Sequence, residues 1–420
     1  MAGVDNDLVA VTGAATLDNG ARLELIRLSA DAAYRAALTA ADNPTPGQLR
    51  YTILSTTDGV QGQFAALGLA EVTVEKVREG RDVQLVLSGN GGGGDGGTGI
   101  VVNQAPVQLG LVLPQEPMWG CRAGMIGNST NASQARDETS CVWVNPHVLR
   151  GSLDTVSGGD AANPYTITGA DYLAGGIALG RDVPLDKDWH VGGAFTYAAI
   201  DADLDAGGSQ RSSAYHFMAY GAYSRDDWEA AFWGGYTRYI VKSSRGTGLE
   251  ATPTAKAQFD MHQLRLGGAV RRVLPIDANW TLLPRASLSY EPIRRKAYAE
   301  TGGGDANFRA DAERWDILKS TLGTTLRYTW TDRPEMTAEF DAAWQGLIGP
   351  TGMELKGTYE GAPNQTFATG RTPYPHSSLV VSAGFSHRAP DDAIFAIAYT
   401  GKFNSAQRES QLDVKFKWKF

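Results

Sequence analysis

The sequence predicts an all-β protein: a 12-stranded antiparallel transmembrane β-barrel, preceded by a short β-solenoid-like segment and a Gly-rich linker. Three observations predict this fold. Apolar and polar residues alternate over twelve runs in the last two thirds of the chain. The connections between these runs alternate in length, and the last run ends on aromatic residues. The three features together are typical of a barrel that separates lipid from a polar lumen.

The composition suits a β-rich membrane protein and excludes one class of partner. The 420 residues include 50 glycines, 10 tryptophans and 16 tyrosines, and 42% of them are hydrophobic. The formal net charge of −8 argues against a nucleic-acid partner, which would need a basic face. No apolar run reaches the roughly 18 residues of a transmembrane helix.

Residues 1–88 predict short strands of a parallel β-solenoid or a small sandwich, because short β-rich runs are separated by Gly, Asp-Asn and Pro. Residues 30–41 have a helical composition and are the one exception. The first residues, M-A-G-V-D-N-D-L, show no basic region followed by an apolar core, so no signal peptide is predicted. If the protein reaches the outer membrane, we therefore expect the sequence to be a fragment or a truncated gene product.

Residues 89–140 predict a Gly/Pro-rich linker. The glycines of residues 89–97 indicate flexibility and not a phosphate cradle, because no G-K-[ST] follows them. Cys121 and Cys141 are the only cysteines, and either one disulfide or two unrelated thiols fits the sequence. A bridge would close a loop of about 20 residues and would stabilise the fold by about 3 kcal/mol.

The remaining residues, 141–420, predict the barrel. Each alternating run is near or above the roughly 9–11 residues that a tilted strand needs to cross a membrane. The runs are 142–150, 168–181, 188–200, 212–224, 227–242, 257–273, 279–291, 315–330, 335–347, 377–387, 392–402 and 408–420. The long connections are 151–167, 201–211, 243–256, 292–314 and 348–376. They alternate with short ones at 182–187, 225–226, 274–278, 331–334 and 388–391, and only 403–407 breaks the trend.

The alternation assigns each side chain to one of two faces, since strand side chains point to opposite sides in turn. In the last strand one face is apolar, and its members are Leu412, Val414, Phe416, Trp418 and Phe420. Tryptophans beside the short turns predict an aromatic girdle of Trp189, Trp228, Trp280 and Trp330. The predicted pore-lining charges are Glu229, Arg265, Arg285, Lys319, Arg327, Glu339 and Asp341. These charges fit a hydrated pore that lets a polypeptide pass, or a network that makes the lumen rigid.

Residues 169–197, G-A-D-Y-L-A-G-G-I-A-L-G-R-D-V-P-L-D-K-D-W-H-V-G-G-A-F-T-Y, resemble the C-terminal translocator domain of bacterial autotransporters, the type V secretion proteins. The terminal K-F-K-W-K-F and the twelve-run barrel add to the resemblance. Residues 49–64, L-R-Y-T-I-L-S-T-T-D-G-V-Q-G-Q-F, resemble the autochaperone-like end of an autotransporter passenger.

The resemblance implies three parts: the end of a passenger at 1–88, a pore-threading segment within 89–140 and a translocator barrel at 141–420. It implies export of the passenger to the cell surface through the outer membrane. The five apolar residues of the last strand would then be an assembly signal for the barrel assembly machinery, with outer-membrane lipid and periplasmic chaperones as further partners. A monomer is expected. The family threads a helix through the pore, and here only 133–139 has weak helical character, so we expect a largely extended segment.

No catalytic, cofactor or metal site is predicted. The six histidines show no metal-ligand spacing, no G-x-S-x-G motif occurs, and no Asn-Asn pair is present for the passenger cleavage that some family members perform. A porin-like channel is the alternative function. A surface adhesin or enzyme, with its active passenger upstream of this sequence, is compatible with the translocator.

Overall fold

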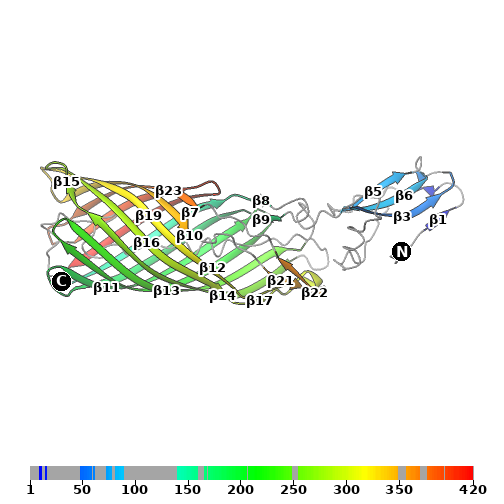
Figure 1. Cartoon of the computed structure of the whole chain (residues 1–420), viewed down its shortest axis with the longest axis horizontal. Coiled ribbons are helices and arrows are strands. Elements are labelled where there is room, and N and C mark those ends of the chain that lie inside the picture. The colour runs from blue at the N-terminus through cyan, green and yellow to red at the C-terminus, as the bar shows by residue number, and fades with distance from the viewer. Residues whose placement is uncertain are drawn as a thin grey trace.

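A computed structural model describes most of the predicted barrel and parts of the N-terminal segment (Figure 1). The described residues are 9–11, 15–16, 48–58, 60–61, 72–77, 81–88, 140–158, 165–167, 169–205, 207–247, 254–348, 356–368, 376–391 and 393–419. The helices expected at 30–41 and 133–139 fall outside these ranges. Within them, no helix is long and apolar enough to cross a membrane.

Twelve long strands form a closed antiparallel barrel, which confirms the predicted fold. The first six are β7 (Cys141–Leu153), β10 (Ala170–Pro184), β11 (Trp189–Leu204), β12 (Gly208–Arg225), β13 (Trp228–Gly246) and β14 (Thr254–Arg272). The second six are β16 (Trp280–Arg295), β19 (Glu313–Thr329), β20 (Met336–Ile348), β23 (Ser377–Arg388), β24 (Ile394–Phe403) and β25 (Gln407–Lys419). Consecutive strands pair in order, and β25 pairs with β7 to close the barrel. The stub β15 (Leu274–Pro275) extends the turn before β16.

All twelve predicted runs coincide with these strands, but several strands extend further than the alternation suggests. The clearest difference is the connection at 201–211, which the sequence predicts to be long. Cross-strand pairing of β11 and β12 continues to Asp203 and Ser209, so only residues 205–207 connect the strands. The prediction was wrong because the strands continue beyond the apolar band. The polar residues there still satisfy their backbone N–H and C=O groups by hydrogen bonding across the two strands.

Two faces follow from the strand registers. Apolar side chains such as Leu322 and Phe340 point outward and are each 56% exposed. The polar residues between them, such as Arg327 and Asp341, point into the lumen and are buried. Because lipid covers the outer face of such a barrel, exposure to solvent in an isolated chain means exposure to lipid in a membrane.

The lumen wall is not polar throughout, which corrects the simple alternation picture. Inward-facing apolar side chains of β11 to β20 form a cluster in the half of the barrel nearer the long loops. Its members include Tyr239, Val241, Phe259, Met261, Ile293, Trp315, Ile317 and Leu347. Trp315 and Trp344 lie at the same end of the barrel but on opposite faces, since Trp315 is 8% exposed and Trp344 is 47% exposed.

The described part of the N-terminal segment contains two short parallel strand pairs. The strand β1 (Val9–Val11) pairs in parallel with β3 (Gln48–Thr56), and β2 (Ala15–Thr16) pairs in parallel with β4 (Val60–Gln61). Two antiparallel strands, β5 (Val72–Val77) and β6 (Asp82–Ser88), then extend the sheet in the order β1-β3-β6-β5. The described N-terminal strands therefore combine parallel and antiparallel pairing, and their assignment to a solenoid stays a prediction.

Candidate functional site

The seven predicted pore-lining residues all face the lumen and are arranged as ion pairs along its wall. Arg285 pairs with Asp341 at 2.8 Å, and Arg327 pairs with Glu339. Glu229 pairs with Arg271, a residue that is not among the predicted pore-lining charges. Arg271 follows Arg265 by six residues on the same strand, and an even spacing places both side chains on the same face. This spacing was the signal that could have identified Arg271 as lumen-facing.

The remaining two predicted residues, Arg265 and Lys319, share one carboxylate, Glu291, which the sequence prediction also missed. The Glu291 carboxylate accepts a hydrogen bond from the Lys319 ammonium at 2.7 Å and lies 3.6 Å from the Arg265 guanidinium. Ser289 and Gln263 donate hydrogen bonds to it, at 2.8 and 3.1 Å. Both its oxygens are therefore partnered although the side chain is 1% exposed, as a buried carboxylate requires.

A second polar network lies where the last strand meets the first. Tyr172 donates to Glu409 at 2.6 Å, and Gln407 donates to the Tyr172 hydroxyl at 3.0 Å. Further along β25, Asp413 accepts from Asn145 at 3.3 Å and from Gln411 at 2.8 Å. The bonds to Tyr172 and from Asn145 join side chains from the two ends of the barrel sequence, so they stabilise the closing seam on its lumen side.

Glycines opposite lumen aromatics let the rings lie flat against the wall. Gly180 faces Trp143 across the β7–β10 pair, and Gly267 faces Trp233 across the β13–β14 pair. A Cβ atom at Gly267 would meet the Trp233 ring at 2.5 Å, and one at Gly180 would meet the Trp143 ring still more closely. The abundance of glycine thus has a local cause: larger residues would push these rings into the lumen.

The predicted girdle residues gather at the rim with the short turns. Trp189 contacts Tyr223 with ring centroids 5.0 Å apart, and Trp280 contacts Tyr328 at 4.8 Å. Trp330 packs edge-on against the same Tyr328 at 5.0 Å. Trp228 is 51% exposed, and the Arg272 guanidinium lies over its ring. Aromatic rings beside a cation are suited to a membrane–water interface.

The predicted assembly-signal residues lie on the outer face of β25. Leu412, Phe416 and Trp418 are exposed to the lipid side, and Phe416 stacks on Trp418 with centroids 6.0 Å apart. Val414 shares this face and is half-buried, whereas Phe420 lies outside the described residues. Cys141 begins β7 and is not a free thiol. Cys121 lies outside the described residues, so a bridge between the two cysteines stays a prediction.

The described histidines, carboxylates and cysteine do not form a metal site: no three of them lie close enough to hold an ion. His216 bonds to Thr237 at 2.8 Å inside the lumen, while His262 bonds to Tyr236 at 2.5 Å on the outer face.

The two longest predicted loops contribute a sheet of their own, which the sequence pattern does not predict. It contains β17 (Tyr298–Ala299), β18 (Phe308–Ala310), β21 (Lys356–Tyr359) and β22 (Ala362–Ala368), in that order. The strands bring together residues far apart in sequence, because β18 belongs to the loop before β19 and β21 to the loop after β20. Phe308 packs against Tyr359 with ring centroids 5.1 Å apart.

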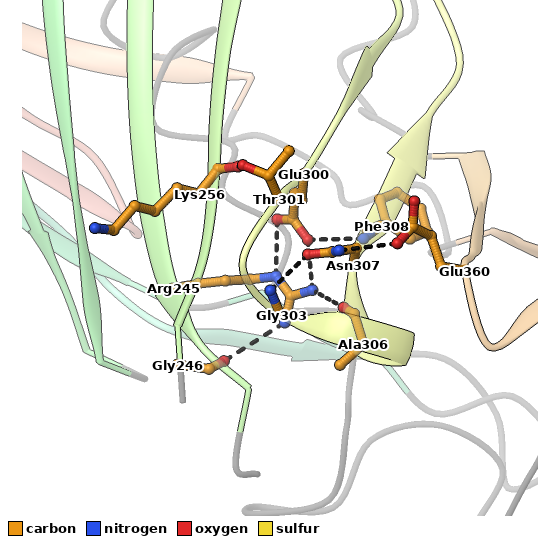
Figure 2. Close-up of polar contacts among 10 residues, drawn as sticks. All are labelled: Arg245, Gly246, Lys256, Glu300, Thr301, Gly303, Ala306, Asn307, Phe308 and Glu360. Carbon is orange, nitrogen blue, oxygen red and sulfur yellow. Dashed lines mark hydrogen bonds and ion pairs between the residues drawn. The ribbon is translucent and has the colours of Figure 1, made fainter. Parts of the chain in front are cut away.

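An arginine at the end of β13 holds this sheet to the barrel (Figure 2). Arg245 donates to both Glu300 oxygens, at 2.9 and 2.6 Å, and to the Ala306 carbonyl at 2.6 Å. Glu300 also accepts the Phe308 backbone N–H at 2.8 Å. On the other side of the turn, Asn307 donates to Glu360 at 2.9 Å. The loop sheet is therefore a defined structure with a charged anchor.

Replacing Arg245 by alanine is expected to loosen the loop sheet. The substitution leaves the buried Glu300 carboxylate without its guanidinium, and hydrogen bonds to charged groups contribute about 1.5–3 kcal/mol. We expect chymotrypsin to cleave the folded protein within 298–310 at least about tenfold faster, as the lower end of that energy range implies for local opening. The matched control is Arg309→Ala, which removes an exposed ion pair with Glu360 that solvent screens. Equal cleavage of the two variants would contradict the anchor role.

Tyr359 provides a test by pH. Burial raises the pKa of its phenol from 10.0 to about 12. In an opened loop the phenol titrates near its ordinary value, so the sheet gains stability from the neutral phenol below about pH 10 and loses it as pH rises through 12. Tyrosinate absorbance should show a late titration step that Tyr359→Phe reduces by the absorbance of one phenol. An unchanged titration curve in that variant would contradict the assignment.

The geometry so far defines a class: a membrane-spanning β-barrel with a lipid face, a polar lumen and an ordered loop sheet at one rim. The family model described as "Autotransporter beta-domain" matches residues 148–400, which is more than half of the chain. The structure is similar to the translocator domain of autotransporter NalP from Neisseria meningitidis, with a TM-score of 0.54 at 14% identity, covering 69% of this chain and 92% of that one. The beta domain of the Bordetella autotransporter BrkA gives a TM-score of 0.49 at 13% identity, covering 67% and 100% of the two chains.

A relative by sequence is the "Extracellular serine protease" of Serratia marcescens. The two are 24% identical over 296 residues, which are 69% of this chain and 27% of that protein. The chain thus spans about a quarter of that relative's length.

The chain belongs to the autotransporter beta-domain family. Its barrel is the outer-membrane translocator of a type V secretion protein, which supports export of a passenger to the cell surface. The rim with the short turns accordingly faces the periplasm, and the rim with the loop sheet faces the outside.

Proposed function

We propose that residues 1–88 are the C-terminal end of the exported passenger, that residues 89–140 thread the lumen, and that residues 141–420 are the translocator. The observation that carries this proposal is the direction of β7. The strand begins with Cys141 at the periplasmic rim, where it pairs with Lys419, and runs outward to Leu153. A passenger end at the cell surface therefore requires the chain before Cys141 to cross the membrane.

The lumen is the one polar route for that crossing. An extended chain advances at most about 3.3–3.6 Å per residue, so about 13 residues span a membrane of 40–45 Å. The segment 89–140 exceeds this length several times. The walls it would pass carry ion pairs of both signs, which suit a polar polypeptide with no single net charge.

We assign no catalytic group to the barrel. The seven predicted lumen charges are engaged as ion pairs, which is the arrangement expected of a wall that supports a crossing chain. The barrel would then act by folding and by providing a passage, and any activity would belong to the passenger.

Surface labelling tests the proposal. The full chain is placed behind a cleavable export signal with an epitope before Met1 and is produced in a Gram-negative host. We expect antibody to bind intact cells, and added protease to remove the epitope without permeabilisation. If the epitope is reached only after the outer membrane is opened, while the barrel is heat-modifiable on gels, the translocator role is overturned in favour of a channel with a periplasmic domain.

We also propose that the barrel assembly machinery, supplied with the chain by periplasmic chaperones, reads the outer face of β25. The support is its unbroken apolar row ending in the stacked pair Phe416 and Trp418. Phe416→Ser with Trp418→Ser should abolish most surface signal in cells. The same variant should still refold in detergent, since cross-strand backbone pairing of β25 is retained. Loss of refolding in detergent to the same extent would indicate a structural role only.

A further inference from the structure

We infer that the outer surface of the barrel carries a binding site for a phosphate-bearing lipid headgroup of the outer leaflet. The site is a row on four neighbouring strands, close to the extracellular rim, in which Arg238, Arg294 and Arg314 supply the charge and His262 lies between the first two. It does not depend on the export route, because it lies on the lipid face and not in the lumen.

The registers of the strands bring the row together. Arg238 on β13 is opposite His262 on β14, His262 is opposite Arg294 on β16, and Arg294 is opposite Arg314 on β19. All four have the same outward parity as the lipid-facing residues of their strands. Lys296 lies beside the row, two residues after Arg294 and just past the end of β16. Residues that are directly opposite in adjacent strands have Cβ atoms about 4.5–5.5 Å apart, so the four side chains of the row are neighbours on the outer surface.

The row lies at the upper edge of the apolar band. Between His262 and Arg272 the outward residues of β14 are Leu264, Leu266, Gly268 and Val270, all of them apolar. Ten residues at about 3.3 Å each, on a strand tilted by about 40°, span about 25 Å, which is the height of the apolar band of such barrels. Arg272 with Trp228 marks the periplasmic edge, so the row falls at the level of the outer-leaflet headgroups.

Charge and exposure make the row attractive to an anion. Two carboxylates lie among the cations: Asp260 pairs with Arg238 at 2.9 Å and with Lys296 at 3.7 Å, and Asp316 pairs with Arg314 at 2.7 Å. The side chains of Arg238, Lys296 and Arg314 nevertheless remain 50%, 62% and 46% exposed. The patch has an excess of positive charge on a chain of net charge −8.

Arg294 occupies the middle of the row. The ion pairs of the patch use its neighbours, and among the residues that the structure describes no carboxylate lies within ion-pair distance of Arg294. Its guanidinium is exposed and can form two parallel hydrogen bonds to a phosphate.

Two tyrosines between the row and the apolar band are placed as expected at a membrane–headgroup boundary. Tyr236 contacts His262, with ring centroids 5.9 Å apart, and Tyr290 donates to Asp316 at 2.5 Å while accepting from Arg314 at 3.1 Å. Each ring is apolar toward the band and its hydroxyl faces the basic row, as at a membrane–headgroup boundary. A lipid would therefore contact the barrel with its acyl chains on the apolar band and its phosphate on the arginines.

The test uses the full chain refolded in non-ionic maltoside micelles, with diphosphoryl lipid A as the probe and native mass spectrometry as the readout. The triple variant Arg238→Gln, Arg294→Gln, Arg314→Gln should bind the lipid at least about tenfold more weakly, a change of about 1.4 kcal/mol. The matched control is Arg181→Gln, Arg225→Gln, Arg272→Gln, which removes the same charge near the periplasmic rim. The control should bind like the unaltered chain.

Removing the phosphates from the probe gives a second test on the unaltered chain, so the result does not depend on the folding of a variant. Dephosphorylated lipid A should bind at least about tenfold more weakly than the diphosphoryl form, because the arginines would lose their charged partner. The inference is overturned by equal affinity for both lipids, by a row variant that binds like the unaltered chain, or by equal loss in the row and control variants.

Discussion

Arginine in place of Leu322 or Phe340 is expected to prevent most of the protein from assembling in a membrane. Both side chains are 56% exposed on the outer face and would be surrounded by lipid. An arginine near the midplane of a barrel exterior costs about 2–4 kcal/mol. Measured as the heat-modifiable fraction after refolding into lipid vesicles, we expect a decrease of tenfold or more in the folded-to-unfolded ratio, as that energy implies.

The control places the same residue on the other face at the same depth. Phe340 is opposite Ala383, and the next pair along is Asp341 with Ser382. Ser382 is half-buried in the lumen, so an arginine there would reach the Asp341 carboxylate and not lipid. Ser382→Arg should assemble nearly as well as the unaltered chain. Equal damage from Ser382→Arg and Phe340→Arg would show that the assignment of the two faces is wrong.

The sequence was sufficient to predict the barrel because one physical constraint repeats along it. Every crossing strand must present apolar residues to lipid and polar residues to the lumen, so the pattern in residues 279–291 or 335–347 is visible without any structure. Parity then assigned Glu229 and Lys319 to the lumen, where the structure has them.

Contacts between distant segments were beyond this reasoning. The strands of the loop sheet have 2, 3, 4 and 7 residues, too few to show a period, and they pair across two different loops. The apolar lumen cluster was missed for a related reason. Val241 and Met261 interrupt the polar face of their strands, and only the three-dimensional wall shows that such residues lie together.

The ion-pair partners were missed because register is not visible in one strand. Arg271 faces the lumen with the correct parity, but its pairing with Glu229 depends on how β13 and β14 align. The row of basic residues on the outer face was missed for the same reason. Arg238, Arg294 and Arg314 are far apart in sequence and become neighbours only through the register of the strands.

Glu291→Gln is expected to cause a large loss of stability of the folded barrel. The carboxylate is buried between Lys319 and Arg265, and its removal leaves two cations facing each other without the anion that they share. Breaking a buried pair in this way costs about 3–5 kcal/mol, because each remaining cation is desolvated and has lost a counter-charge. Urea unfolding of the refolded protein, followed by tryptophan fluorescence, should show a lower midpoint with an unchanged slope.

A double variant separates the effect of charge from the effect of packing. Glu291→Gln combined with Lys319→Met removes one anion and one cation, so the net charge of the cluster returns to its original value. We expect the double variant to be more stable than Glu291→Gln alone, since Arg265 no longer faces a second buried cation. Ser289→Ala removes one hydrogen bond to the carboxylate and should cost less than Glu291→Gln, about 1.5–3 kcal/mol. The opposite result is that the double variant is less stable than the single variant by the full cost of losing Lys319. The cluster would then stabilise the barrel through packing and not through charge. The lumen charges would in that case serve the passage of the chain without stabilising the barrel.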